Sequence, residues 1–116
     1  MGTNATIKTA TNMILYRVDD TYVKDARGKI LYKFNGDYFM EYPNNIIIKI
    51  YDDRICDIMG RIIFKVDDNY IRDVMGRIIY KLESSCVKNA TGYILYRIDG
   101  NINDIDLACV LAAIDD

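Results

Sequence analysis

The chain contains no histidine among its 116 residues. Without an imidazole, one chain cannot form a serine–histidine or cysteine–histidine nucleophilic pair, a histidine proton shuttle or a histidine metal site. Cysteine is scarce as well, with only Cys56, Cys86 and Cys109. Their odd number and wide spacing match neither a secreted disulfide framework nor a zinc site. We therefore expect reduced thiols that fill core or surface positions.

Long apolar stretches are absent too. The longest, residues 107–114, is much shorter than the roughly 20 residues that a membrane-spanning helix needs. Residues 1–6 have neither a basic start nor an apolar run of signal-peptide length. We therefore expect a cytoplasmic protein that does not span a membrane.

Neither sign of charge is in clear excess. Fifteen Lys and Arg stand against 17 Asp and Glu, which gives a formal net charge of −2. Because domains that bind nucleic acid usually carry a marked basic excess, nucleic acid is not an expected partner. The composition, 51% hydrophobic and 28% charged, is typical of a folded domain.

What the sequence does contain is an internal repeat of sixteen residues. A hydrophobic residue followed by a basic one recurs at this spacing, at Tyr16-Arg17, Tyr32-Lys33, Ile48-Lys49, Phe64-Lys65, Tyr80-Lys81 and Tyr96-Arg97. Seven units follow one another without insertion, at residues 5–20, 21–36, 37–52, 53–68, 69–84, 85–100 and 101–116. This uninterrupted register predicts a single repeat domain over residues 1–116.

Each unit contains two short β-forming runs that flank a turn segment, Asp-x-x-Gly. Aspartate suits the first position of a type I turn, and glycine suits a last position that needs positive φ. The predicted turn residues are Asp25, Gly28, Asp57, Gly60, Asp73, Gly76 and Gly92. The units join through a second tight turn, such as Asn35-Gly36 or Asp99-Gly100. The expected fold class is therefore all-β, an array of antiparallel hairpins that is curled or closed.

Strand pairing can be tested by the faces on which side chains lie. A three-residue loop at 26–28 pairs Tyr22 with Tyr32 and places Val23 on the opposite face from both. A two-residue join at Asn35-Gly36 would then exchange the two faces in the next unit, which equivalent units do not allow. Either the second turn holds a bulge, or the units stack as a two-sided β-solenoid. Stacking would place the basic residues in a ladder of like charges, so hairpins are favoured.

The seventh unit departs from the pattern. Ala108 stands at the position of the turn glycine, and a candidate helix cap, Asp104, precedes an apolar run with helical spacing. This run predicts either a short helix over 104–115 or one more strand. A terminal unit of either kind would cover the open end of the repeat array.

The most regular unit reads Tyr70-Ile71-Arg72-Asp73-Val74-Met75-Gly76-Arg77-Ile78-Ile79-Tyr80. It resembles the short bacterial β-hairpin repeats built on Asp-x-x-Gly-basic-aliphatic, the kind found in four-fold beta flower proteins. More distantly, it is similar to the tyrosine–aspartate repeats of large bacterial toxin shells. The resemblance covers nearly the whole chain and implies a hairpin-repeat fold, but no activity and no functional residue. The chain departs from that pattern in having seven units instead of four.

Carboxylates recur in a column formed by Asp25, Glu41, Asp57 and Asp73. They lack the ligand spacing of calcium-binding loops, and turn formation explains them without a metal. Equivalent carboxylates in like environments also do not suit a glycosidase-type acid pair. We therefore expect no metal site and no cofactor.

A basic column suggests one binding hypothesis. Its members are Lys33, Lys49, Lys65, Lys81 and Arg97. If they line up on a solvent-exposed face, they could bind an anionic polymer or ligand, with neighbouring tyrosines available for stacking. The alternative is that each cation pairs with a nearby carboxylate across the sheet.

A second aliphatic column lies on the face opposite Ile30 and Tyr32, so that both faces of the sheet carry hydrophobic residues. Its members are Leu31, Ile47, Ile63, Ile79, Leu95 and Leu111. Such a row must be covered by curling, by the C-terminal segment or by another subunit. The leading hypothesis is therefore a non-enzymatic structural or protein-interaction module that binds a protein partner or itself. An enzymatic site, as the competing hypothesis, is expected in the divergent segment 37–45, which holds the only proline.

Overall fold

The computed structural model describes residues 4–83 and 85–114, which contain twelve strands and one helix. The elements are β1 (Asn4–Thr9), β2 (Ile14–Asp19), β3 (Tyr22–Asp25), β4 (Ile30–Asn35), β5 (Tyr38–Glu41), β6 (Asn45–Tyr51), β7 (Arg54–Cys56), β8 (Ile62–Asp67), β9 (Tyr70–Arg72), β10 (Ile78–Glu83), β11 (Cys86–Asn89), β12 (Ile94–Asn101) and α1 (Asp104–Ile114). The strands close into one antiparallel barrel, each next to its neighbour in sequence. The predicted all-β hairpin array is confirmed, and the solenoid alternative is wrong.

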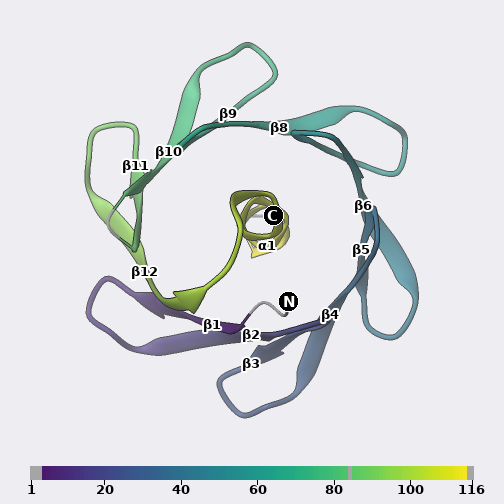
Figure 1. Ribbon diagram of the computed structural model, residues 1–116, viewed down its shortest axis with the longest axis vertical. Coiled ribbons are helices and arrows are strands. Elements are labelled where there is room, and N and C mark those ends of the chain that lie inside the picture. The colour runs from purple at the N-terminus through teal and green to yellow at the C-terminus, as the bar shows by residue number, and fades with distance from the viewer. Residues whose placement is uncertain (1–3, 84, 115–116) are drawn as a thin grey trace.

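Six hairpins make up the barrel wall, from β1–β2 to β11–β12, and each nearly coincides with one sixteen-residue unit. Figure 1 shows them arranged in a ring around α1, with the loop of each hairpin turned outward. Because successive strands run in opposite directions, the six hairpin loops lie at one end of the barrel and the joins between hairpins at the other. We call these loops the hairpin tips.

The first and last strands close the barrel. β1 pairs with β12 over six residues, from Asn4 opposite Asn101 to Thr9 opposite Tyr96. Closure leaves the wall without the free strand edges that would recruit another chain. We call this β1–β12 pair the seam.

One β-bulge in each hairpin corrects the predicted pairing. Val23, not Tyr22, lies opposite Tyr32, because the register shifts by one residue after Val23 and leaves Leu31 as the extra residue. The joins between hairpins carry no bulge. Asn35 pairs with Tyr38, so the join consists of residues 36–37, one residue later than predicted.

The bulge also decides which side chains point into the barrel. Val23 is fully buried inside, whereas Tyr22 lies on the outer face with its partner Lys33. The predicted pairing places Tyr22, not Val23, on the face of Tyr32. Three columns fill the interior: Ile7, Val23, Phe39, Ile55, Ile71 and Val87; Tyr16, Tyr32, Ile48, Phe64, Tyr80 and Tyr96; and Val18, Phe34, Ile50, Val66, Leu82 and Ile98. The bulge positions Ile47, Ile63 and Ile79 also pack partly against this core, and Leu111 of the same row is buried on the C-terminal helix, whereas Leu95 stays exposed.

Helix α1 occupies the interior of the barrel (Figure 1). Residues 107–111 are buried against side chains from the wall, as expected for a helix that is apolar on every side. A barrel of about eight strands is filled by its own side chains, but the diameter grows with strand number, so twelve strands leave room for a helix. The seventh unit therefore fills the interior instead of covering an open end.

The helix begins at Asp104 as predicted, but its cap lies one residue earlier. Asn103, not Asp104, is the cap, because its Oδ1 accepts a hydrogen bond of 2.7 Å from the backbone N–H of Asp106. The carbonyl oxygen of Asn103 accepts the first helical bond, from the N–H of Leu107, at 3.0 Å. Asp104 and Asp106 lie in the first turn, where negative charge interacts favourably with the helix dipole.

Candidate functional site

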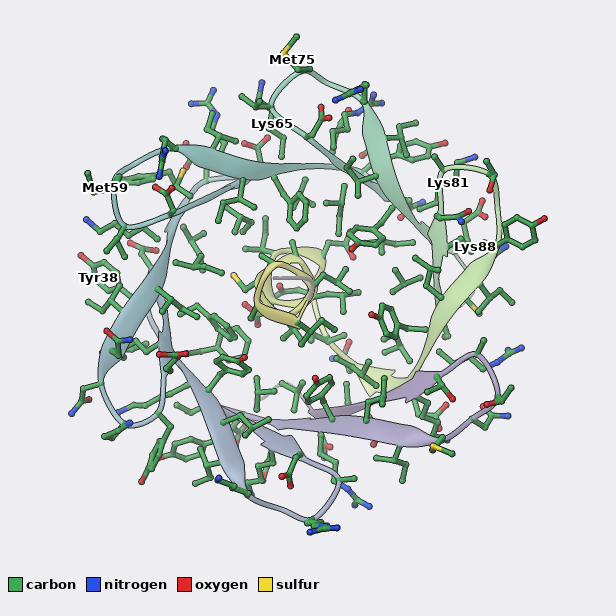
Figure 2. All side chains as sticks on the ribbon, turned by 180° about the vertical axis from the view of Figure 1, so that it is seen from behind. Tyr38, Met59, Lys65, Met75, Lys81 and Lys88 are labelled. Carbon is green, nitrogen blue, oxygen red and sulfur yellow. The ribbon has the colours of Figure 1, made fainter. Side chains whose placement is uncertain are left out.

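The basic column predicted from the sequence forms a ring around the outside of the barrel. Lys33, Lys49, Lys65, Lys81 and Arg97 each lie on the second strand of a different hairpin, with Arg17 completing the ring on β2. Figure 2 shows Lys65 and Lys81 on the outer side of successive hairpins. The structure therefore spreads the column around the wall and does not gather it into one stripe.

A second set of cations lies directly opposite the first across the strand pairs. The pairs are Arg17 with Lys24, Lys65 with Arg54 and with Arg72, Lys81 with Lys88, and Arg97 with Lys8. Like charges that face each other across a sheet destabilise it, so these pairs concentrate positive charge at a cost in stability. Sequence inspection missed them, because only the register shows which columns are neighbours.

Within the described residues, carboxylates pair with every cation of the second set except Arg54. Lys88 Nζ lies 3.2 Å from Glu83, Arg72 Nε lies 3.4 Å from Asp67, and Lys24 Nζ lies 3.5 Å from Asp19. Lys8 pairs with Asp99 in the same way. By contrast, Lys33, Lys49, Lys65 and Lys81 form no ion pair with any residue that the structure describes.

The column of carboxylates serves the hairpin turns. Asp57 Oδ1 accepts hydrogen bonds of 2.9 Å from the backbone N–H groups of Met59 and Arg61, and Arg61 Nε donates to Oδ2 at 3.0 Å. The bond from the Arg61 N–H holds the pKa of Asp57 below its ordinary value of 3.8, and Gly60 ends the turn with φ +89°. Asp25 and Asp73 accept the equivalent backbone bonds. The other predicted turn glycines, Gly28, Gly76 and Gly92, likewise have positive φ.

Large hydrophobic side chains gather at the hairpin tips. Met59 and Met75 are 77% and 78% exposed, and Figure 2 shows both at the outer ends of their loops. The other exposed ones in or beside the loops are Met13, Tyr42, Ile46, Ile58, Val74, Tyr93 and Leu95. Of the exposed large hydrophobics on described residues, only Tyr38 and Tyr51 lie elsewhere. Sequence inspection treated the turns as backbone chemistry and so missed this surface.

An opening of about 440 Å³ lies where the C-terminal part of α1 meets the wall. Glu41, from the divergent segment 37–45, lines it together with Asp57, Tyr32 and Ala113. Asp57 already accepts hydrogen bonds from the backbone of its turn, and Glu41 Oε1 accepts a hydrogen bond of 2.7 Å from the Asn45 side chain. The competing hypothesis of an enzymatic site in 37–45 stays a prediction.

The three thiols lie apart and are free. Cys109 is fully buried on α1, and burial raises the pKa of its thiol well above the ordinary value. Across residues 4–83 and 85–114, no three acidic or cysteine side chains lie close enough together to hold a metal ion. In the same residues, no helix is both long and apolar enough to cross a membrane.

A groove of about 450 Å³ separates the first two hairpins on the outside of the barrel. We call it the first groove. Its lining residues are Asn4, Ala5, Thr6, Arg17, Val18, Asp19, Lys24, Ala26, Arg27 and Gly28. The predicted binding residues included none of these, although Arg17 stands in the same column of the repeat, and Lys24 and Arg27 come from two other columns.

Comparison with known proteins gives no match: no family model, no curated protein and no solved structure matches the chain. Functional assignment therefore depends on the residues described above.

Proposed function

We propose that the protein is a non-enzymatic interaction module that binds a protein partner through its hairpin tips. The observation that carries this proposal is the recurrence of exposed Met, Ile, Val and Tyr side chains in the loops of successive hairpins, at one end of the barrel. Large exposed apolar side chains that recur at equivalent positions of one surface are candidates for a site of interaction. The ring of rigid hairpins would present these side chains to a partner in fixed positions.

Neighbouring tips support the proposal most strongly. Ile58 and Met59 occupy one tip, and Val74 and Met75 occupy the equivalent positions of the next. Methionine side chains adapt their shape to a partner, and interaction surfaces use them often. The paired tips therefore offer an apolar contact surface that a partner with a complementary apolar patch would cover.

Kinship with bacterial hairpin-repeat proteins is part of the proposal, and it brings no activity with it. The free cysteines support a reducing compartment such as the cytoplasm. A second copy of the chain is one form that the partner can take, because tips of two molecules would bury the same side chains against each other.

The test uses the double variant Met59→Ser/Met75→Ser. Partners are captured from the native organism by cross-linking to the full-length protein, and their affinity is then measured with purified components. We expect the double variant to bind at least about tenfold more weakly, because truncation of central apolar contacts removes the largest part of binding energy. Sedimentation of the protein alone, at several concentrations, reports self-association in the same two proteins.

The matched control is Tyr51→Ser, which removes an exposed hydrophobic side chain at the opposite end of the barrel, beside a join. It should bind the partner as the unchanged protein does. Equal affinity of the double variant and the unchanged protein would show that the tips are not the contact surface.

A further inference from the structure

The first groove, between hairpin β1–β2 and hairpin β3–β4, is open because small residues line it. Thr6 and Ala26 lie at its sides. At the equivalent positions of the next groove stand Tyr22 and Tyr42, whose rings meet edge to face with centroids 6.1 Å apart. Two aromatic rings thus occupy that neighbouring groove, whereas the first groove keeps a volume of about 450 Å³, within the usual range for small-molecule sites.

The first groove also carries one positive charge that the equivalent positions of the other hairpins lack. Arg17 and Lys24 face each other directly across β2 and β3. Arg27 stands at the tip, and the residues at the equivalent position of the other hairpins are uncharged: Thr11, Pro43, Met59, Met75 and Thr91. Arg27 is thus a departure from the repeat that adds a third cation to the lining.

Carboxylates compensate these cations only in part: Asp25 interacts with Arg27 through charge, without an ion pair. Asp19 is the one carboxylate among the lining residues, and it pairs with Lys24 at 3.5 Å. The guanidinium groups of Arg17 and Arg27 make no hydrogen bond or ion pair with the part of the chain that the structure describes. Two guanidinium groups are therefore available to a ligand in the same groove.

Guanidinium groups bind tetrahedral oxyanions through paired, charge-assisted hydrogen bonds. An anion in this groove would also relieve the repulsion between Arg17 and Lys24. The nearest comparison is the group of cations around Lys65, which faces Arg54 and Arg72. There Arg72 is already engaged by Asp67 and by the carbonyl oxygen of Gly76, at 3.0 Å, so that Arg54 supplies the one guanidinium without a partner among the described residues.

We propose that the first groove binds a small molecule that carries a phosphate or sulfate group, held by Arg17, Lys24 and Arg27. Thr6 supplies a hydroxyl beside the bound anion, and the volume of the groove leaves room for the remainder of a molecule such as a sugar ester. This site is separate from the apolar contact surface formed by Met59 and Met75.

The test titrates the full-length protein with inorganic phosphate and, separately, inorganic sulfate, while backbone amide NMR signals are recorded. We expect saturable shifts that concentrate at residues 4–6, 17–19 and 24–29. Stronger binding of phosphate would identify a phosphate ester as the ligand class, and stronger binding of sulfate would identify a sulfate ester.

Two variants should abolish the site, one by removing a cation and one by filling the groove. Both introduce residues that other units carry at the equivalent position. Arg27→Met introduces the side chain found at the equivalent tips of β7–β8 and β9–β10, and Thr6→Tyr introduces the side chain found at positions 22, 38 and 70. Because both residues already occur in this fold, the variants should fold. Each should weaken binding of the better anion by about tenfold or more.

Lys65→Gln is the matched control, because it removes a cation with two cationic neighbours from a different part of the wall. It should leave the affinity unchanged. The proposal is overturned if neither anion gives saturable shifts, if the shifts spread evenly around the barrel, or if Lys65→Gln weakens binding as much as Arg27→Met does.

Discussion

Aspartate at the start of a hairpin turn acts as a hydrogen-bond acceptor for the backbone. In Asp73, Oδ1 accepts 2.9 Å bonds from the N–H groups of Met75 and Arg77. Asn89 holds the equivalent place in the last hairpin, and its Oδ1 accepts the equivalent bonds from Thr91 and Tyr93. The turn therefore needs an oxygen acceptor, and the negative charge is an addition that depends on pH.

This charge predicts a loss of stability in acid. The backbone bond from the residue four positions on is the largest cause that lowers the pKa of Asp25, Asp57 and Asp73 in the folded protein below 3.8. A lowered folded pKa means that each carboxylate contributes stability above about pH 3.8, and that this contribution is lost as the pH falls through the lowered value. The triple variant Asp25→Asn/Asp57→Asn/Asp73→Asn should keep the turns and lose less stability in acid.

The measurement is the thermal unfolding midpoint of both proteins between pH 2 and pH 7. We expect the difference between the midpoints at pH 7 and pH 2 to be smaller in the triple variant. Asp53→Asn, at an exposed join, serves as the control and should follow the unchanged protein. An unaltered acid slope in the triple variant would show that the turn carboxylates do not couple folding to pH.

The turn residues were predictable because their chemistry is local. Asp-x-x-Gly requires a side-chain acceptor at one end and positive φ at the other, and both requirements are visible within four residues. The inward faces were not predictable in the same way. Leu31 is the extra residue of its bulge, but its neighbours Ile30 and Tyr32 are also hydrophobic, so nothing in the sequence marks which of the three the ladder skips.

At the scale of the element, α1 depends on a single side chain for its cap. Asn103 satisfies the N–H of Asp106 at the start of a helix whose next residues enter the core. Asn103→Ala should lower the free energy of unfolding by about 1 kcal/mol, because it leaves that donor without its acceptor. Asn103→Asp should retain the cap and serve as the control.

Urea denaturation of the three proteins measures both effects. Equal stability of Asn103→Ala and the unchanged protein would mean that water or a neighbouring group replaces the side chain. A loss in Asn103→Asp as large as that in Asn103→Ala would indicate that the position tolerates no additional negative charge beside Asp104 and Asp106.

The state of the seventh unit could not be decided from its sequence alone. A short apolar run is compatible with a buried helix and with a buried strand, because every side chain is apolar in both cases and the hydrophobic periodicity does not distinguish them. Leu107, Val110 and Leu111 all face protein. What selects the helix is the space inside a wall of twelve strands, a property that exists only after six other units have paired.

At the scale of the whole molecule, the seam is the most tightly packed site of a glycine. Among the described glycines, Gly100 has the least space for a Cβ atom. Gly100 has φ +95°, and a Cβ there would lie 2.2 Å from the carbonyl oxygen of Asn4, on the strand that closes the barrel. Gly36 has the same place in its own unit, with φ +61°, and a Cβ added to it would have no other atom within 4 Å. The two glycines therefore differ mainly in the closeness of the neighbouring backbone.

Gly36→Ala should lower the stability by about 1 kcal/mol, because a residue with a Cβ adopts positive φ unfavourably. Gly100→Ala should cost about 1–3 kcal/mol more, because β1 must move away from β12 to make room. Chemical denaturation measures the difference, and hydrogen exchange of the β1 amides reports whether the seam opens first. Equal costs at the two positions would show that the seam is free to relax.

The candidate sites could likewise be predicted only in part, because the sequence shows the residues but not which of them lie together in the barrel. Each of Arg17, Lys24 and Arg27 is visible in the sequence, but the barrel register is needed to place them around one groove. The exposed tips could have been found by comparing the residues between the turn aspartate and the turn glycine. Ile58, Met59, Val74 and Met75 are too hydrophobic for positions that only need to turn the chain.

The central helix also fixes how many hairpins the protein can have. Adding a hairpin would widen the interior beyond what one helix fills, and removing one would leave too little space for Leu107, Val110 and Leu111. Tandem copies of a short unit are otherwise free to vary in number between related proteins. In this molecule the volume of the α1 side chains matches the interior of a twelve-stranded wall. Gain or loss of one unit should therefore be tolerated only if the side chains of the helix become larger or smaller to match.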